Sequence, residues 1–259
     1  MPRLILRWQR WLSPAVVLLF LGVWECAYRL HWVSPVLLSA PTKIITQGYI
    51  LLQNPAFHHD IAFTLSVYLL SLVLATLIGT SLGFLIGYSP VVYHILNPFI
   101  VVINSLPKIV LMPLIVLWVG IGMSANTLLG TLMASFPILT ATYTGIRQIE
   151  RDFLLLARAF GAKPGFIIRH ILLPGVMPFT LAGLRVGINY AMVGVLIAEF
   201  FASSQGIGYR MVLLMANFQV DAFFVCLVLI ASVTLTGTTF VHWLEQSLQK
   251  WQPNPFQII

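Results

Sequence analysis

The sequence of 259 residues is 59% hydrophobic and only 8% charged, and its mean hydropathy is +0.95. Soluble domains carry about 25% charged residues, so this composition excludes a soluble globular protein and indicates an integral membrane protein. The net charge of +7 does not indicate nucleic-acid binding, because the basic residues occupy short gaps between apolar runs, where they encode membrane orientation. Cys26 and Cys226 lie inside apolar runs, which favours buried small side chains over a disulfide or a metal site.

The first apolar run follows Arg3, Arg7 and Arg10, as in a signal peptide. Its end carries Trp24 and Glu25 in place of a clear small-x-small cleavage site, so we predict that it is retained as a first membrane span. Hydropathy predicts six spans, each near the roughly 20 residues that a bilayer requires. They cover residues 13–30, 61–88, 95–119, 124–147, 179–201 and 222–244.

Basic residues set the predicted orientation of these spans. If the N-terminus is cytoplasmic, the cytoplasmic side holds Arg3, Arg7, Arg10, Arg147, Arg151, Arg158, Lys163, Arg169 and Lys250. Only Arg29, Lys43 and Arg210 then lie outside, with Lys108 and Arg185 at or within the bilayer. Because cytoplasmic loops carry an excess of Lys and Arg, both termini are predicted to be cytoplasmic.

The segment from His31 to Asp60 is the one sizeable extracytoplasmic connection in this arrangement. Residues 42–53 can form a short interfacial helix after Pro41. His58 and His59 are adjacent and cannot share one helical face at metal-ligand spacing. We expect a solvated loop at the membrane boundary and no metal site.

Two spans carry small residues every four positions. Gly79, Gly83 and Gly87 form such a stripe in the second span, and Gly183 and Gly187 begin another in the fifth. Small residues at this spacing let helix backbones approach closely in lipid. The stripes predict either a tight bundle within the chain or a symmetric partner, and they do not identify a substrate.

The third span contains Pro107 and Pro113, each of which removes a backbone donor, so we predict a kinked helix there. Lys108 lies between the two prolines at membrane depth. An ionisable residue in that place is a candidate functional residue. The alternative is a lysine that reaches the interface or pairs with backbone carbonyls and only organises packing.

The gap between the fourth and fifth spans, residues 147–169, concentrates the charge of the chain. Residues 150–160 are predicted to form a short helix that Gly161 ends. Pro164 can begin a second helix, expected to end before Pro174.

At about 100° per residue, one apolar face of this short helix comprises Phe153, Leu156, Ala157 and Phe160, and we expect it to lie against the chain's own bundle. Leu154 and Leu155 fall on the opposite side, beside Arg151 and Arg158. A cytoplasmic helix that is apolar nearly all round needs a cover. One cover is a partner protein whose groove receives the helix; the other is the membrane interface, with leucines among the headgroups.

The same segment resembles the EAA loop of binding-protein-dependent ABC importer permeases. That loop reads roughly Glu-Ala-Ala, three residues, Gly-Ala, and then an apolar stretch ending in Leu-Pro. Here the matching segment runs from Leu155 through Gly161 and Ala162 to Leu173 and Pro174. The resemblance implies a coupling helix that docks into an ATP-binding subunit, formed by Leu154, Leu155, Leu156, Ala157, Arg158, Phe160, Gly161 and Ala162. Leu155 and Leu156 replace the Glu and Ala of the motif, so docking is expected to be more apolar.

The resemblance extends over about residues 63–245. Leu106-Pro107-Lys108, Met112-Pro113-Leu114 and Leu117–Gly122 are similar to the third span of the nitrate, sulfonate and taurine permease branch, and Gly183-Leu184-Arg185 and Ala198-Glu199 also resemble it.

The fold class that we expect is an all-α integral membrane domain of about six spans, with both termini cytoplasmic and a cytoplasmic coupling helix between spans four and five. The expected division is residues 1–60 as tail, first span and outer loop, residues 61–245 as an ABC type-1 permease domain, and residues 246–259 as a cytoplasmic tail.

The resemblance also implies partners: two ATP-binding subunits, a second copy of this chain, an extracytoplasmic solute-binding protein and the lipid bilayer of a bacterial inner membrane. The chain itself is expected to be a transport subunit and not an enzyme, with no catalytic residues, metal or cofactor. It contains no Gly-x-x-x-x-Gly-Lys-Ser/Thr loop, so ATP and magnesium would be bound by the partner subunit.

Lys108, Arg185 and Glu199 are the candidate residues of a translocation pathway. Cations facing a cavity would attract an anionic solute, and Glu199 is the better candidate for a gate or packing contact. A nitrate-, sulfonate- or taurine-like anion is the expected substrate. Bicarbonate, riboflavin and thiamine-precursor pyrimidines are alternatives within the same machinery. An ATP-independent secondary transporter or a scaffold subunit are alternatives outside it.

Overall fold

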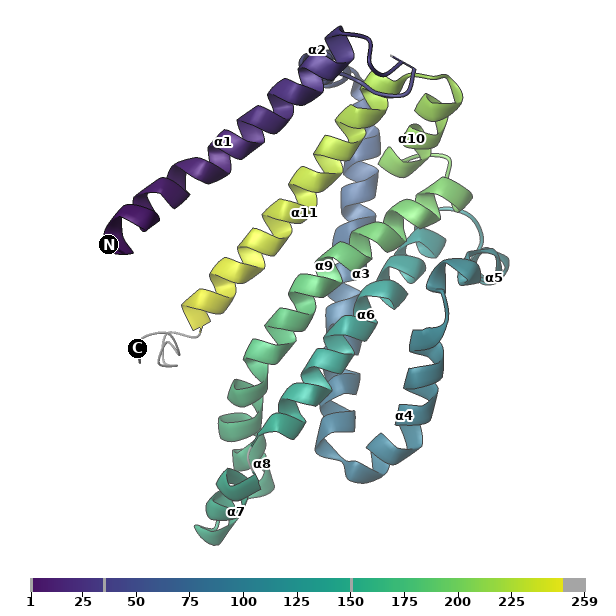
Figure 1. Cartoon of the computed structure of the whole chain (residues 1–259). Helices are drawn as coiled ribbons and strands as arrows, with labels where there is room; N and C mark the ends of the chain where they lie inside the picture. Colours follow the sequence, from purple (N-terminus) through teal and green to yellow (C-terminus); the bar gives the residue numbers. More distant parts are fainter. Residues whose placement is uncertain (1, 35, 150, 249–259) are drawn as a thin grey trace. The chain divides into compact units, whose positions relative to one another are not determined.

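A computed structural model describes residues 2–34, 36–149 and 151–248, and these form helices joined by short connections (Figure 1). In chain order the helices are α1 (Pro2–Arg29), α2 (Pro41–Leu51), α3 (Pro55–Tyr88), α4 (Pro90–Ser105), the 3₁₀ helix η1 (Lys108–Leu111), α5 (Met112–Val119), α6 (Met123–Gln148), α7 (Arg151–Ala159), α8 (Pro164–Ile167), the π turn η2 (Ile168–Leu172), α9 (Leu173–Ala202), α10 (Ile207–Ala216) and α11 (Val220–Leu248). The all-α expectation is confirmed for this part of the chain.

The chain divides into two compact units. The smaller unit comprises the segment up to Asp60 together with Arg210–Ile230. The larger unit comprises Ile61–Tyr209 and the segment from Ala231 onward. The functional residues that the sequence predicts all lie in the larger unit.

The core of the larger unit is α6, which packs along α9 and is contacted from another side by α3 (Figure 1). A Cβ atom added at Gly79 would lie 2.8 Å from the carbonyl oxygen of Ser135. One added at Gly83 would lie 2.7 Å from the carbonyl oxygen of Leu139. A Cβ atom at Gly87 would lie 2.8 Å from Ile146 Cβ. These glycines are therefore required for the close approach of α3 to α6.

The glycine stripe of the fifth span makes the same kind of contact with α6. A Cβ atom at Gly183 would lie 2.7 Å from Ala141 Cβ, and one at Gly187 would lie 3.1 Å from Ile138 Cδ1. Of the two interpretations of the stripes, the tight bundle within the chain accounts for both sets of glycines.

Three described helices are long and apolar enough to cross a membrane by length and composition: α3, the continuous stretch Pro164–Ala202, and α11. The bent pair α4 and η1–α5 raises this to four if it counts as one span. The remaining two predicted spans correspond to α1 and α6, and α6 is not among these helices. Helix α6 has buried polar residues, among them Asn126, Thr131 and Thr142, because other helices cover it.

The prediction of one kinked helix over residues 95–119 is wrong in its extent. The axis turns by 91° between α4 and the η1–α5 segment. Leu106, with ψ 135°, and Pro107, with ψ 99°, are both extended. For Leu106 this is expected, because Pro107 follows it and disfavours the helical region. Pro113 causes no kink, because it lies in the first turn of α5, where its missing N–H has no helical partner to lose.

The prediction that the second cytoplasmic helix ends before Pro174 is also wrong. Helix α8 continues through η2 into α9, and Pro174 lies in the first turn of α9. In η2 the Leu173 N–H donates to the Ile168 carbonyl, the five-residue bond of a π turn. This wider turn lets the helix pass a proline that would otherwise clash with the preceding turn.

Substitution of Gly83 by alanine tests the close approach of α3 to α6. The added methyl group meets the Leu139 carbonyl, and such overpacking costs about 1–3 kcal/mol. We expect a lower unfolding midpoint for detergent-solubilised protein in a denaturant titration. Gly22→Ala is the matched control, because nothing lies within 4 Å of that position. Equal stability of the two variants would contradict the packing role.

Candidate functional site

Helix α7, which the sequence predicts to be cytoplasmic, ends in a complete C-terminal cap. Gly161 has φ +78°; its N–H donates to the Arg158 carbonyl at 2.9 Å, and the Ala162 N–H donates to the Ala157 carbonyl at 3.0 Å. This pair of bonds is a Schellman motif, which requires a left-handed residue at the position of Gly161. The predicted stop at Gly161 and its positive φ are confirmed. Glu150, the predicted first residue of the helix, lies outside the described residues.

One side of α7 packs on the bundle. Leu154, Ala157 and Ala162 contact a buried cluster formed by Ile146 of α6, Ile167 of α8, Leu172 of η2 and Val176 of α9. Leu154 and Ala157 are three residues apart and lie on the same face of the helix. The Schellman turn places Ala162 in the same cluster as Ala157, as expected from the apolar contact that accompanies this cap.

The other side of α7 is apolar and exposed. The exposed fractions are 60% for Phe153, 60% for Leu155, 58% for Leu156 and 83% for Phe160. The predicted arrangement of faces is therefore wrong for Phe153, Leu154, Leu156 and Phe160. Ala157 packs on the bundle, and Leu155 and Arg158 are exposed, as predicted. The small side chain of Ala157 permits close packing, so the Leu154–Ala157 edge faces the bundle and the two phenylalanines face away from it.

Lys108 begins η1, directly after the break in the third predicted span. Its Nζ atom donates to the carbonyl oxygen of Asn104 at 3.4 Å and to Asn104 Oδ1 at 3.2 Å. It also lies 4.6 Å from the ring centroid of Phe136 in α6. The break in the chain thus holds a lysine whose charge is met by oxygen dipoles and an aromatic face. No carboxylate of the described residues forms a salt bridge with it.

Arg185, in α9, forms an ion pair with Glu245 of α11. Its Nη2 atom also lies 3.1 Å from His242 Nδ1. The Arg185 side chain is 38% exposed. Because the Glu245 carboxylate already compensates its charge, Arg185 attracts an anionic solute less strongly than an unpaired cation would.

Glu199, near the end of α9, is fully buried. It accepts hydrogen bonds from the Thr64 hydroxyl, at 2.8 and 3.0 Å to its two oxygens, and from the Gly208 N–H at 2.7 Å. The prediction of a packing contact fits these partners better than that of a substrate ligand. Lys108, Arg185 and Glu199 have separate partners: Asn104 and Phe136 for Lys108, Glu245 and His242 for Arg185, and Thr64 and Gly208 for Glu199.

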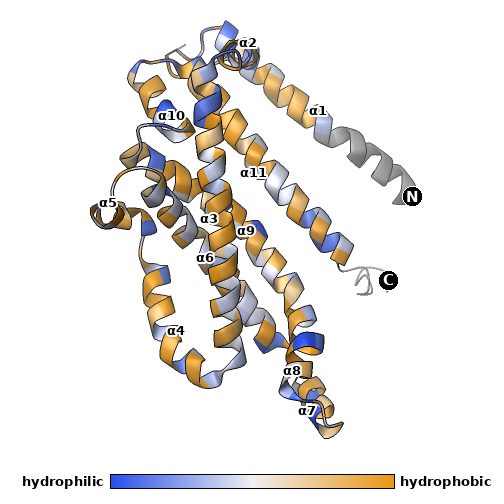
Figure 2. Ribbon diagram, turned by 180° about the vertical axis from the view of Figure 1, so that it is seen from behind, coloured by the Kyte–Doolittle hydropathy of each residue, from blue (hydrophilic) through white to orange (hydrophobic). Residues whose placement is uncertain are grey.

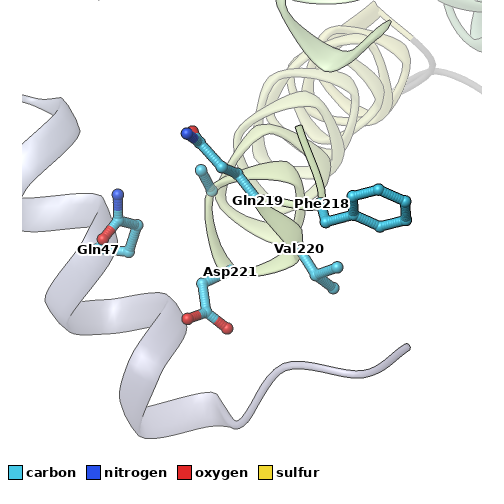
Figure 3. A pocket seen from close by; sticks show the side chains of 6 residues that line it. Gln47, Phe218, Gln219, Val220 and Asp221 are labelled. Carbon is cyan, nitrogen blue, oxygen red and sulfur yellow. The ribbon is translucent and has the colours of Figure 1, made fainter. Parts of the chain in front are cut away.

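The smaller unit contains a pocket of about 260 Å³ lined by Gln47 of α2, by Asp221 and Ala222 of α11, and by Phe218, Gln219 and Val220. The side chains of Gln47 and Asp221 border the same gap, and Phe218 points away from it (Figure 3). Phe218 is 74% exposed and has φ +56°, a conformation that a bulky residue rarely adopts.

Sequence reasoning missed helix α10 and the role of Thr64. A helix of ten residues after the fifth span leaves a weak pattern, because Ile207–Ala216 is apolar nearly throughout. The one available signal was the pair Gly206 and Gly208 soon after Glu199, since glycines mark close approach of a backbone to another group.

Residues 75–250 match the family of binding-protein-dependent transport system inner membrane components. The chain belongs to this family. It is a multi-pass inner-membrane permease subunit of an ABC transporter, and the resemblance to the sulfonate and taurine branch is confirmed.

Several relatives of this permease cover nearly its whole length. The putative aliphatic sulfonates transport permease protein SsuC of Bacillus subtilis is 30% identical over 93% of this chain and 86% of its own. The formylaminopyrimidine transport permease protein ThiX of Halalkalibacterium halodurans is 27% identical over 93% and 96%. The taurine transport system permease protein TauC of Escherichia coli is 27% identical over 96% and 94%.

The fold of the permease is also similar to that of a solved transporter. The structure titled inward facing conformations of the MetNI methionine ABC transporter aligns with a TM-score of 0.66 at 18% identity, over 73% of this chain and 94% of the other. At this identity the likeness shows the shared fold.

The Schellman turn at Gly161 generates a prediction about transport. Valine at this position must adopt φ +78° against a cost of about 1–2 kcal/mol, so we expect the turn to distort and α7 to shift. Binding-protein-dependent uptake should fall by about tenfold, as a shift of that energy implies. The control is Gly165→Val, because Gly165 is equally open and has no positive φ. Wild-type uptake by the Gly161 variant would refute this role.

Proposed function

We propose that this permease forms the membrane pathway of an importer that takes up a small anionic nutrient. Two copies of the chain would enclose the pathway, two separate ATP-binding subunits would drive it, and an extracytoplasmic binding protein would deliver the solute. The exposed apolar face of α7, formed by Phe153, Leu155, Leu156 and Phe160, is the observation that carries this proposal.

Six spans with both termini in the cytoplasm fit the lengths of the helices. Helix α6 has 26 residues and α1 has 28, and at 1.5 Å per residue each exceeds the roughly 30 Å hydrocarbon core of a bilayer. Helix α6 can cross with a polar sequence because α3 and α9 cover it. The excess of Lys and Arg in the loop that contains α7 supports a cytoplasmic position for that loop.

The α7 face suits a protein groove better than water. Burial of a large apolar side chain contributes about 1.5–3 kcal/mol, and Phe153, Leu156 and Phe160 follow one another at helical spacing of three and four residues. A partner that encloses them would grip α7 as a knob. The contacts of Leu154 and Ala157 with the bundle would then pass the partner's motion to α6 and α9.

Substitution of Phe160 by glutamate tests this docking contact. A charge at a side chain that is 83% exposed should leave the fold intact but oppose burial in an apolar groove. We expect co-purification of the ATP-binding subunit in detergent to fall by tenfold or more, about 1.4 kcal/mol. Phe166→Glu, at an aromatic residue that is 52% exposed on α8, is the control. Equal losses for both variants would argue against a specific role of α7.

The sulfonate and taurine relatives favour an anionic substrate, and the likeness to the formylaminopyrimidine permease favours a thiamine-precursor pyrimidine as the second candidate. Of the three candidate pathway residues, Lys108 is best placed to attract an anion, because its partners are the oxygens of Asn104 and the ring of Phe136 and include no carboxylate of the described residues. Arg185 is a weaker candidate, since Glu245 pairs with it.

Charge reversal at Lys108 tests the anionic substrate. In reconstituted vesicles with the cognate binding protein, Lys108→Glu should lower taurine- or sulfonate-dependent ATPase activity by at least about tenfold, because an attractive charge becomes repulsive in a poorly screened site. Lys108→Arg keeps the charge and should retain most of the activity. Unchanged stimulation of the Lys108→Glu variant would exclude an anion path past this residue.

A further inference from the structure

Glu199 is a carboxylate with 0% of its surface exposed, on a helix of the proposed membrane domain. Removal of a carboxylate from water costs several kcal/mol unless its oxygens are hydrogen-bonded. An apolar side chain of similar volume would fill this place at lower cost. A buried carboxylate at this place therefore has a role beyond filling space.

The partners of Glu199 connect three helices. The Thr64 hydroxyl of α3 donates to the Glu199 carboxylate of α9 and accepts the Ile207 N–H at 2.8 Å. The Gly208 N–H donates to the same carboxylate at 2.7 Å. Ile207 and Gly208 are the first two residues of α10, whose N–H groups have no partner within the helix. One carboxylate and one hydroxyl thus anchor the first turn of α10 to α3 and α9, and the negative charge suits the helix N-terminus.

Two glycines allow this approach. Gly206 has φ +104°, and a Cβ atom there would lie 2.6 Å from Glu199 Cδ. A Cβ atom at Gly208 would lie 2.7 Å from Glu199 Cβ. The backbone on either side of Ile207 therefore touches the glutamate side chain at distances that other residues would not permit.

The same turn of α9 is also fixed on its other side. Ala198 and Ala202 pack in a buried cluster with Met112 and Ile115 of α5 and with residues of α6. The Gly122 N–H, between α5 and α6, donates to the Ala202 carbonyl at 3.0 Å. A displacement of the first turn of α10 would therefore reach α9 and the break after α4.

We propose that Glu199 and Thr64 are positioning residues that couple the first turn of α10 to the transmembrane bundle. A movement that the binding protein imposes on the segment after α9 passes through this polar anchor to α3 and α9. Directional hydrogen bonds fix one orientation of the turn, whereas an apolar contact would permit sliding. This inference rests on the proposed function, because it requires a binding protein on the side of α10.

The test compares Thr64→Val with Thr64→Ser in the complete complex with ATP-binding subunits. Valine keeps the shape of threonine and removes the hydroxyl, whereas serine keeps the hydroxyl. We expect both variants to assemble and to hydrolyse ATP at the wild-type basal rate. The stimulation of ATP hydrolysis by the cognate binding protein loaded with taurine should fall by about tenfold in Thr64→Val, because this variant loses a hydrogen bond to a charged group. In Thr64→Ser the stimulation should persist. In Glu199→Gln, which keeps one acceptor oxygen, the stimulation should be intermediate between those of the two Thr64 variants.

The outcomes separate this inference from the proposed function. Normal stimulation of Thr64→Val and Glu199→Gln would overturn the coupling role while leaving the importer intact. Failure of both variants to assemble, or a parallel loss of basal activity, would also overturn it, because Thr64 and Glu199 would then serve folding alone. A wild-type chain that assembles with no ATP-binding subunit would contradict the proposed function itself.

Discussion

The structure depends on how closely α3 and α9 approach α6. Helix α6 carries buried polar residues that lipid would not tolerate, so it needs protein on its sides. Glycines on α3 and α9 bring the two helices within contact of the α6 backbone. Leu70, Val73 and Leu77 of α3 are among the apolar side chains left exposed, and orange, apolar stretches recur along the helices (Figure 2). The buried helix thereby becomes the body against which α7, α5 and the end of α9 are all positioned.

Much of this arrangement was predictable from the sequence, because it follows from local rules. Glycines at four-residue spacing predicted the helix contacts, Gly161 predicted the end of α7 with its positive φ, and Pro107 predicted the break in the third span. The family followed from the string of residues around Gly161 together with the matching segments in the third and fifth predicted spans, and the match over residues 75–250 confirms it.

The remainder could not be predicted, because it depends on contacts between distant segments. The face that α7 turns to the bundle is decided by Ile146, Ile167 and Leu172, which a helical wheel of α7 alone does not contain. Pairing of Arg185 with Glu245 joins residues sixty positions apart in the sequence. Similarly, no sequence pattern around Thr64 predicts its hydrogen bond to Glu199, 135 residues away. The angle between α4 and the η1–α5 segment depends on what α5 packs against, whereas Pro107 specifies only the position of the break in the sequence.

The π turn between α8 and α9 affects how the orientation of α7 can change during evolution. A π turn arises when one residue is added to an α-helix, and each residue of a helix corresponds to about 100° of rotation. Deletion of one residue in Ile168–Leu172 would turn α7 and α8 around the axis of α9 without shortening α9 itself. The change of a single codon can thus re-aim α7 while α9 keeps its length and its contacts with α6.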